Sequence, residues 1–339
     1  MYMKNNDNSS RFSVIADNGR RKSSTHAGVL LGCLGVLAFS FSLPANKLAV
    51  AGIDAVGVTV WRAALAGLLA LAYLRIVGAQ RPALHDLAAL LCSGLGVVVG
   101  FPLFSSLALE RIDSATGAVI LGLLPAMTAT FAALLGGERL PWLFWGATGA
   151  GVLVLCAFLV STSPDALSGF ALSWGHLWMV LGTVSAGFGY AVGGTQAKRI
   201  GGAQSISWSL VLLLPISVPL CALTAATGSF SLTGPVVIGM VYITVISQFL
   251  GFFAWYGGLA RGGIARVGQI QQVQPLLTIA WSALLLGEHL DRWIYPVGVV
   301  LGLLVWIAQR ARFREAALAV PPAPAPAASD ANEPVSLRR

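Results

Sequence analysis

The sequence predicts an all-α integral membrane protein in which ten transmembrane helices form two inverted five-helix repeats. Three observations predict this class: an apolar composition, a series of long apolar segments, and a motif that occurs twice. Of the 339 residues, 56% are hydrophobic and only 10% are charged. A soluble domain of this length needs more charge on its surface. The composition therefore favours a chain that lies almost entirely in a membrane.

The apolar segments are continuous rather than alternating, so they predict helices and not the strands of a barrel. Each segment is long enough to cross the hydrocarbon core, which takes roughly 20 helical residues. No stretch between the segments is long enough to form a separate soluble domain. The ten predicted helices cover residues 27–50, 56–78, 84–108, 114–135, 141–162, 174–195, 206–226, 234–259, 264–286 and 292–310.

Both ends of the chain differ in composition from the apolar part. Residues 1–26 are rich in Asn, Ser, Arg and Lys, which predicts a disordered N-terminal tail. We do not expect a cleaved signal peptide, because the next apolar segment is too long and holds Lys47 near its end. Residues 314–339 are rich in Ala and Pro and predict a disordered C-terminal tail.

The net charge is +8, and the basic residues are distributed unequally between the two sides of the predicted membrane helices. If the N-terminus is cytoplasmic, the inner side of the predicted helices carries most of the basic residues, and the outer loops carry Arg111 and Arg292. This is the positive-inside pattern, and it predicts that both termini are cytoplasmic. The charge therefore gives no reason to expect a nucleic-acid partner. The inner basic residues outside the C-terminal tail are Lys4, Arg11, Arg20, Arg21, Lys22, Arg75, Arg81, Arg139, Lys198, Arg199, Arg261 and Arg266.

A segment around Pro125 and Glu138 recurs 150 residues later, around Pro275 and Glu288. The predicted repeats, 27–162 and 174–310, hold five helices each. Because five is odd, the second repeat must start on the opposite side of the membrane. Inverted repeats place equivalent gates on opposite faces and are typical of carriers that work by alternating access. The alternative interpretation is that the duplication determines only the fold and has no role in gating.

These residues carry a resemblance to a known family. Pro-x-x-Thr and Leu-Leu-x-Gly-Glu-x-Leu occur in both halves, within 125–140 and 275–290. Further motifs are 259–267, Ala45-Asn46-Lys47 and Trp61-Arg62. The chain resembles the EamA-type members of the drug/metabolite transporter superfamily over residues 27–310. The resemblance implies ten helices, a central cavity between the halves, and export or exchange of small metabolites such as amino acids. It also implies a bacterial protein of the inner (cytoplasmic) membrane.

Two basic residues lie further inside the apolar segments than the others, Lys47 and Arg62. One interpretation is that they extend to the outer interface or pair with Asp54 or Glu110. The other is that one of them neutralises the carboxylate of a solute, which is a strong interaction in a low dielectric. Arg62 has no counterpart in the second half, as expected for a substrate contact. We keep both residues as candidates.

Polar and aromatic side chains gather in the eighth and ninth predicted helices. Buried amides need hydrogen-bonding partners, so these side chains either join helices together or line a path for a polar solute. Gln269 and Gln272 share one helix face, and Gln271 and Gln274 share another, so at most one pair is central. The candidate substrate-binding residues are Asn46, Lys47, Arg62, Tyr190, Gln248, Trp255, Tyr256, Gln269, Gln272 and Trp281.

The repeated motif also predicts structural and gating residues. Glu138 and Glu288 each follow a glycine in a predicted tight turn, where a negative charge complements the N-terminal dipole of the next helix. Pro125 and Pro275 fall inside predicted helices and are expected to kink them. Such kinks are candidate hinges.

The sequence therefore predicts a secondary transporter and not an enzyme, because no catalytic, metal-binding or cofactor-binding grouping occurs. The 13 Asp and Glu residues lie at helix ends, in loops or in tails, which favours facilitated diffusion or exchange over proton coupling. Export of amino acids or related small polar metabolites is the first hypothesis. Drugs and nucleotide-sugar-like solutes are the alternatives. The expected partners are the lipid bilayer and a small solute; the oligomeric state is open, and a monomer fits.

Overall fold

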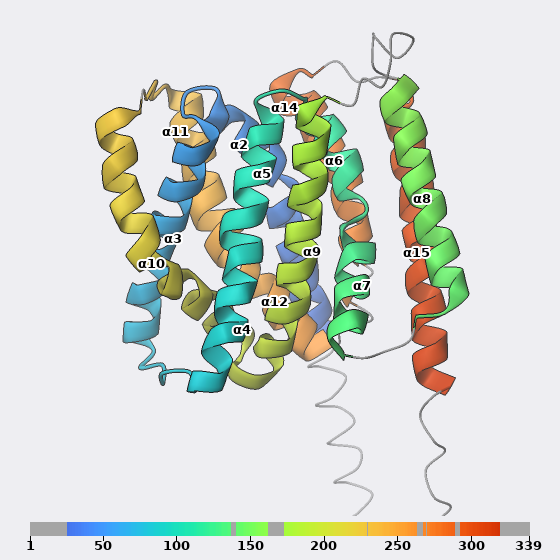
Figure 1. The fold of residues 1–339 in the computed structure, drawn as a ribbon, viewed down its shortest axis with the longest axis horizontal. Coiled ribbons are helices and arrows are strands. Elements are labelled where there is room, and N and C mark those ends of the chain that lie inside the picture. The colour runs from blue at the N-terminus through green and yellow to red at the C-terminus, as the bar shows by residue number, and fades with distance from the viewer. Residues whose placement is uncertain are drawn as a thin grey trace, which may run out of the picture.

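The structure is a computed structural model that describes residues 26–136, 140–161, 173–228, 230–262, 267–268, 270–288 and 292–318. Both predicted tails lie outside these ranges, apart from residues 26 and 314–318. The described chain is helical and its helices run side by side in one bundle (Figure 1). α8 (Trp142–Ser161) and α15 (Ile294–Leu318) pair at one end of the bundle, and α10 (Gly202–Thr227) stands at the other.

The remaining elements follow the predicted segments. A helix over 26–40 precedes α2 (Ser42–Val50) and α3 (Ala55–Ile76). The others are α4 (Leu84–Gly94), the π-helix η1 (Leu95–Gly100), α5 (Phe101–Leu109), α6 (Ser114–Leu121), α7 (Leu124–Gly136), α9 (Trp174–Ile200), α11 (Gly234–Val241), the π-helix η2 (Tyr242–Leu250), α12 (Gly251–Gly262), the 3-10 turn η3 (Gln271–Val273) and α14 (Gln274–Leu286).

Nine helical segments within the described ranges are long and apolar enough to cross a membrane. They agree closely with nine of the ten predicted segments. The exception is 264–286, because residues 263–266 and 269 lie outside the described ranges. The longest described helix there, α14, has 13 residues and is by itself too short to span. Ten spans and the inversion of the repeats therefore stay predictions. α15 continues to Leu318, so the last helix extends past the predicted boundary at 310.

The helices predicted over 174–195 and 206–226 are longer in the structure than in the prediction. α9 runs to Ile200 and α10 begins at Gly202, so a single residue, Gly201, joins the two helices. Gly201 has a φ of 89°, which side-chain-bearing residues rarely adopt. A glycine in this conformation reverses the chain without a longer loop. The apolar pattern missed the junction because polar residues on both sides of Gly201 belong to helix ends.

The first membrane segment is interrupted at Phe41. Pro44 has no N–H, so it cannot pair with the carbonyl of Ser40, which a continuous helix would require. Thr278 of α14 supplies a donor: its Oγ1 lies 2.8 Å from the Ser40 oxygen and 3.0 Å from the Gln274 oxygen, so the two carbonyls compete for its single proton and the Ser40 oxygen is the nearer. Trp281 Nε1 donates to Ser40 Oγ at 3.0 Å, and its ring stacks on Phe41. The sequence-predicted site residue Trp281 therefore supports this interruption.

Replacing Thr278 with valine is expected to lower the free energy of unfolding by about 1 kcal/mol, because the Ser40 carbonyl loses its donor. The loss should be smaller in a Pro44→Ala background, where residue 44 regains the N–H that can pair with Ser40. A double-mutant cycle on unfolding free energies measures this coupling. Equal losses in both backgrounds would contradict the proposed compensation.

Prolines also interrupt the two segments of the repeated motif. We expected Pro125 and Pro275 to kink continuous helices, but the helices break instead. A turn at 122–123 separates α6 from α7, and Pro125 is the second residue of α7. Pro275 is likewise the second residue of α14, directly after η3. Both prolines lie in the first turn, where a missing N–H costs little.

A second pair of irregularities repeats with the same 150-residue offset. In η1 and η2 the helix widens, so the N–H of Phe101 donates to the carbonyl of Gly96, and that of Gly251 donates to Ile246. Each donor lies five residues after its acceptor. Such wide turns are rare and often mark functional sites. The sequence analysis did not predict them.

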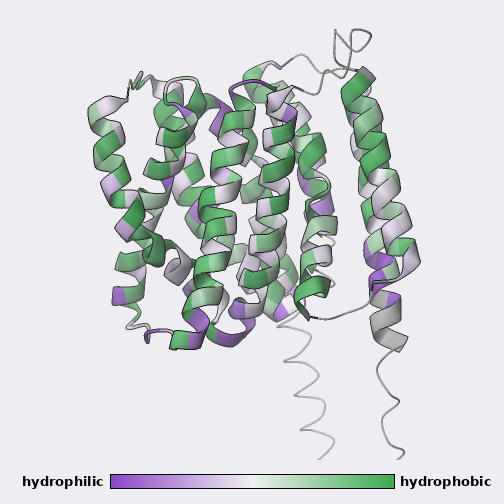
Figure 2. Ribbon diagram, in the orientation of Figure 1, coloured by the Kyte–Doolittle hydropathy of each residue, from purple (hydrophilic) through white to green (hydrophobic). Residues whose placement is uncertain are grey.

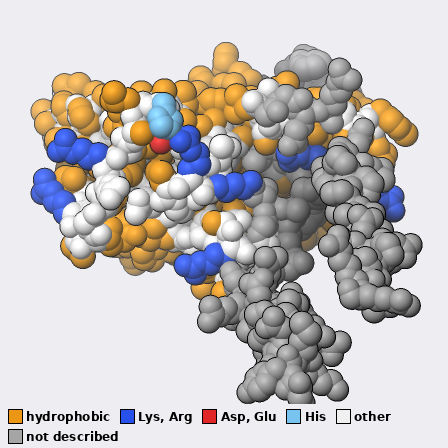
Figure 3. Space-filling view, turned by 90° about the horizontal axis from the view of Figure 1, so that it is seen from below, with side chains coloured by type: hydrophobic (Ala, Val, Ile, Leu, Met, Phe, Trp, Pro, Cys, Tyr) orange, Lys and Arg blue, Asp and Glu red, His pale blue; other side chains and the backbone are white. Residues whose placement is uncertain are grey.

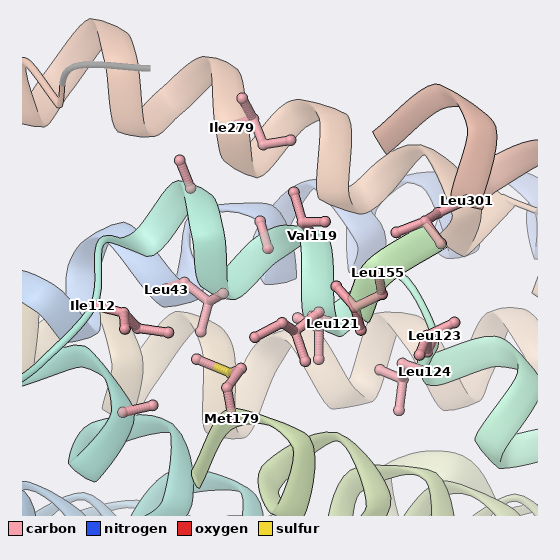
Figure 4. Packing of buried hydrophobic residues seen from close by; sticks show 14 of the residues in the cluster. Leu43, Ile112, Val119, Leu121, Leu123, Leu124, Leu155, Met179, Ile279 and Leu301 are labelled. Atoms are coloured by element: carbon pink, nitrogen blue, oxygen red, sulfur yellow. The ribbon is translucent and has the colours of Figure 1, made fainter. Parts of the chain in front are cut away.

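The two predicted repeats do not form separate bundles. The most extensive helix pairs join one half to the other: α3 with α10, α8 with α15, α5 with α9, α7 with α9, and α11 with α2. Figure 4 shows the largest apolar cluster, where Leu43, Leu121 and Leu155 of the first half meet Met179 and Ile279 of the second. Separating the halves would therefore expose much of the core.

Polarity follows the ends of the helices. Figure 2 shows apolar residues along most helices and hydrophilic residues gathered at the lower ends. Figure 3 looks at this lower face, where Lys and Arg side chains are spread. Exposed basic residues at these ends include Arg75, Arg81, Lys198 and Arg261. A buried Asp86 on α4 also pairs here with Arg199 of α9, at 2.6 Å.

Candidate functional site

A small cavity lies in the middle of the bundle, between the largest apolar cluster and a second cluster around Phe39, Val97 and Phe252. Its volume is about 20 Å³, enough for one water-sized sphere. The cavity in this structure is therefore too small for an organic solute. The lining residues come from both halves and are Phe39, Ser42, Arg62, Val97, Phe101, Leu121, Leu124, Ala186, Tyr190, Ser247, Phe252 and Gln274.

The interruptions of the helices converge on this cavity. Ser42 opens α2, Gln274 opens α14, and Leu121 and Leu124 flank the turn between α6 and α7. Val97 and Ser247 belong to the two π-helices. Irregular backbone inside a membrane protein is tolerated where it is buried in protein or lines a cavity, and broken helices of transporters often form the binding site.

Arg62 of α3 is the charged residue of this cavity. It is 2% exposed, and its Nη2 donates to Ser247 Oγ at 3.2 Å. Ser247 in turn shares a hydrogen bond of 2.7 Å with Ser42. Arg62 Nε has no hydrogen-bonding partner among the described residues. An ionised side chain within a membrane segment is costly and is usually functional.

No described acidic side chain forms an ion pair with Arg62. The predicted alternative, pairing with Asp54 or Glu110, does not occur. Asp54 accepts a hydrogen bond from Gly57 N at the start of its own helix, about two turns from Arg62. Glu110 accepts from Ala55 N and pairs with Arg111. The positive charge of Arg62 therefore faces the cavity with hydroxyl, amide and aromatic neighbours only.

Tyr190 of α9 lines the same cavity, within an aromatic group. Its ring centroid lies 5.7 Å from that of Phe252 and 6.4 Å from that of Trp255. Trp255 and Tyr256 are fully buried in the apolar cluster beside the cavity and do not line it. The predicted site residues Arg62 and Tyr190 are thus brought together, with Trp255 and Tyr256 directly behind them.

The glutamines divide into two groups. Gln274 lines the cavity, and Gln271, one turn earlier, is 4% exposed. Gln272 is half-buried and is not among the lining residues, and Gln269 lies outside the described residues. This corrects the choice between the two faces, because the cavity lies on the side of Gln274 and not of Gln272. Gln248 donates to the carbonyl of Val97 at 3.2 Å and so joins the two π-helices.

Asn46 and Lys47 contact α5 rather than the cavity. Asn46 exchanges hydrogen bonds with Ser105 and Ser106 at 3.4 and 3.2 Å. Lys47 Nζ donates to the carbonyls of Leu109 and Ile112, at 2.7 and 2.9 Å. These carbonyls lie at the C-terminal end of α5, where a positive charge complements the helix dipole. The structure does not bring either residue to the site of Arg62.

Replacing Lys47 with methionine is expected to lower the free energy of unfolding by about 2 kcal/mol, since two charged hydrogen bonds are lost. The half-saturation concentration for solute should stay within about twofold, because Lys47 does not reach the cavity. Thermal unfolding and solute exchange measure the two effects, with the exposed Lys198→Met as control. Weakened solute binding without a loss of stability would restore Lys47 as a substrate contact.

Glu288 has a structural role different from the predicted one. Its carboxylate accepts hydrogen bonds from Ser114 N, Ser114 Oγ and Ala115 N, at 2.9, 2.8 and 3.0 Å. It therefore complements the N-terminal dipole of α6 in the first half, and not that of the next helix. The adjacent Gly287 has a φ of 63° and reverses the chain as predicted. Glu138 lies outside the described residues.

A much larger hollow of about 680 Å³ opens on the side of the bundle between α3, α11 and η2. Its lining is almost entirely apolar, with Trp61, Leu65, Phe230 and Val241 as examples. It holds no charged residue among those that line it. Of the two cavities, the one that a charged residue lines is therefore the small one at Arg62.

Sequence reasoning missed Ser42, Ser247 and the apolar lining of the cavity. Serines and phenylalanines are common in membrane helices, so nothing in their pattern distinguishes these residues. The available signal was the prolines, since Pro44, Pro125 and Pro275 each lie within a few residues of a lining residue. The π-helices carry no comparable signal.

Comparisons with known proteins identify the family. Residues 26–162 and 173–307 each match the model of the EamA-like transporter family. The chain is 39% identical over 288 residues to the "Uncharacterized transporter YdeK" of Bacillus subtilis (strain 168), covering 85% of this chain and 99% of that protein. A solved crystal structure that is 17% identical superposes with a TM-score of 0.54, covering 84% of this chain and 98% of that one. At that identity the likeness concerns the fold alone. The chain therefore belongs to the EamA-like transporter family and is a multi-pass membrane transporter.

Proposed function

We propose that this transporter is a secondary carrier that exports amino acids or related small polar metabolites by alternating access, with the Arg62 cavity as its solute site. The observation that carries the proposal is a buried arginine without an acidic partner among the described residues, at the point where the interrupted helices meet. A solute carboxylate would supply the missing charge and accept hydrogen bonds from the guanidinium.

The composition of the cavity supports this class of solute. Gln274 Oε1 is buried and has no described partner, so it can accept a hydrogen bond from an ammonium or hydroxyl group. Phe39, Phe101 and Phe252 surround the remaining volume and suit an apolar side chain. With about 20 Å³ available, the cavity must widen to hold a solute, as expected of a closed state between two open ones.

The alternatives differ in what the cavity would have to supply. A nucleotide-sugar-like solute carries a diphosphate, which several basic residues usually hold. Arg62 is the one basic side chain among the described lining residues. This favours a single carboxylate over a diphosphate. An uncharged drug would leave Arg62 without a counter-charge.

Counterflow in proteoliposomes tests the proposal. Vesicles loaded with a pool of unlabelled amino acids, at equal pH on both sides, receive labelled amino acids one at a time. Transient accumulation of one label, abolished by omitting the internal pool, is the expected result. If no amino acid accumulates in folded protein, the amino-acid hypothesis is rejected. Accumulation of a labelled drug or nucleotide sugar instead would support the alternative class.

A further inference from the structure

The cavity beside Arg62 poses a problem for the carrier when no solute is bound. A guanidinium that is 2% exposed carries its charge in the middle of the membrane segments. Burial of an unpaired charge is strongly unfavourable. The Asp and Glu side chains that the structure describes are all at helix ends. Asp54, Asp86, Glu110 and Glu288 hold helix N-termini or pair with Arg199 and Arg111, and Asp113 directly precedes α6. Within this part of the chain, no carboxylate compensates the charge of Arg62.

We propose that a small inorganic anion, chloride under ordinary conditions, binds at Arg62 in the solute-free carrier. The site has donors that a halide needs: the guanidinium of Arg62 and a hydroxyl of the Ser42–Ser247 pair. Arg62 Nε is a buried donor without a described partner. The cavity of about 20 Å³ accepts one water-sized sphere. A chloride ion is somewhat larger than water, so its binding requires a small outward shift of the lining side chains, whereas a large organic anion requires a much wider cavity.

The arrangement of hydroxyls fits an anion. The hydrogen bond between Ser42 and Ser247 uses one of their two hydroxyl protons, and Ser247 accepts a further hydrogen bond from Arg62. The second hydroxyl proton therefore remains available to donate to an anion. Charge-assisted donors that converge on a dry site bind anions strongly. The phenylalanines around the cavity keep water away and so preserve the low dielectric.

This inference concerns the site of the proposed function, and it rests on that function in one respect only: the solute carboxylate replaces chloride at Arg62. Chloride then competes with solute and holds the charge of the carrier balanced between transport steps. External chloride should therefore slow counterflow relative to the bulky sulfonate anion of MES buffer at the same ionic strength.

Chloride binding is measured on the solute-free, full-length protein in detergent. Chloride should raise the Tm saturably relative to the bulky sulfonate anion of MES buffer, which has no carboxylate, at constant sodium, on the order of 2–4 °C at about ten times the Kd. Arg62→Gln should abolish the chloride-dependent shift, and the exposed Arg75→Gln should retain it. An equal shift in Arg62→Gln would place the anion elsewhere, for example on the basic face, and would overturn the proposal. No shift in the wild-type protein would overturn it as well.

Two further measurements keep the test sharp if Arg62→Gln does not fold. Ser247→Ala keeps the charge and removes one hydroxyl, so the chloride Kd should rise about threefold to tenfold. In crystals grown with bromide, the anomalous peak should lie beside the Arg62 guanidinium, and a peak only at surface residues would contradict the proposal. Chloride binding without amino-acid counterflow would reject the proposed solute class alone. Counterflow without chloride binding would reject the chloride site alone.

Discussion

Arg62→Gln is expected to raise the half-saturation concentration for solute at least about 30-fold and, in chloride-free buffer, to leave the protein as stable as the wild type or more stable. Loss of one partner of a buried charge pair usually costs about 2 kcal/mol or more of binding free energy, which is a factor of about 30. Stability moves the other way, because the substitution removes a buried charge that no described side chain pairs.

The combination of the two effects distinguishes the interpretations of Arg62. Counterflow gives the half-saturation concentration and thermal unfolding gives the stability of the same preparation. Arg62→Lys keeps the charge but loses the planar donor fork, so its affinity should fall between those of the wild type and Arg62→Gln. The exposed Arg75→Gln is the control. Lowered stability with unchanged solute affinity would mean that Arg62 is a packing residue.

Glu288→Ala is expected to lower the free energy of unfolding by about 2–3 kcal/mol. The substitution leaves Ser114 N and Ala115 N without their acceptor and removes the charge that complements the α6 dipole. Glu288→Gln should cost less, because its amide oxygen can accept one of these hydrogen bonds. Unfolding free energies of the two variants measure the effect.

Asp113 provides a matched control for Glu288. By position it is the N-cap of α6, and an aspartate there normally accepts from the helix N-terminus. In the structure its side chain makes no capping hydrogen bond. Asp113→Ala should therefore change stability by less than about 0.5 kcal/mol. If Asp113→Ala destabilised the protein as much as Glu288→Ala, the cap would be local and the role assigned to Glu288 would be wrong.

Much of the fold can be predicted from hydropathy. In lipid, the backbone polar groups of a segment must form hydrogen bonds within a helix, and the thickness of the bilayer sets the length of that helix. Nine predicted segments agree with described helices within a few residues, except where α9 and α10 extend to Gly201. The interruptions were harder to predict. Pro125 and Pro275 indicated where two of the helices are interrupted. A proline occurs in the sequence both where a helix kinks and where it breaks, so the sequence did not distinguish the two.

The site was predicted in part. Arg62 was recognised because a basic residue inside an apolar segment is rare, and Tyr190 because of its position. Lys47 is likewise a basic residue inside an apolar segment, yet it donates hydrogen bonds to carbonyls at the end of α5 and does not reach the cavity. Which of two similar residues faces a cavity depends on neighbours far along the chain, such as Ser247 for Arg62. A local pattern does not contain this information.

By itself, the sequence determined the membrane class, the approximate helices, the internal repeat, and the exceptional character of Arg62. These properties depend on local composition and on the energy of placing each residue in lipid. Only the tertiary structure decided that the interrupted helices converge on Arg62, that Gln274 rather than Gln272 lines the cavity, and that Glu288 caps α6 of the other half. Those relations arise from packing between helices more than a hundred residues apart, where shape and hydrogen-bond geometry select the partners.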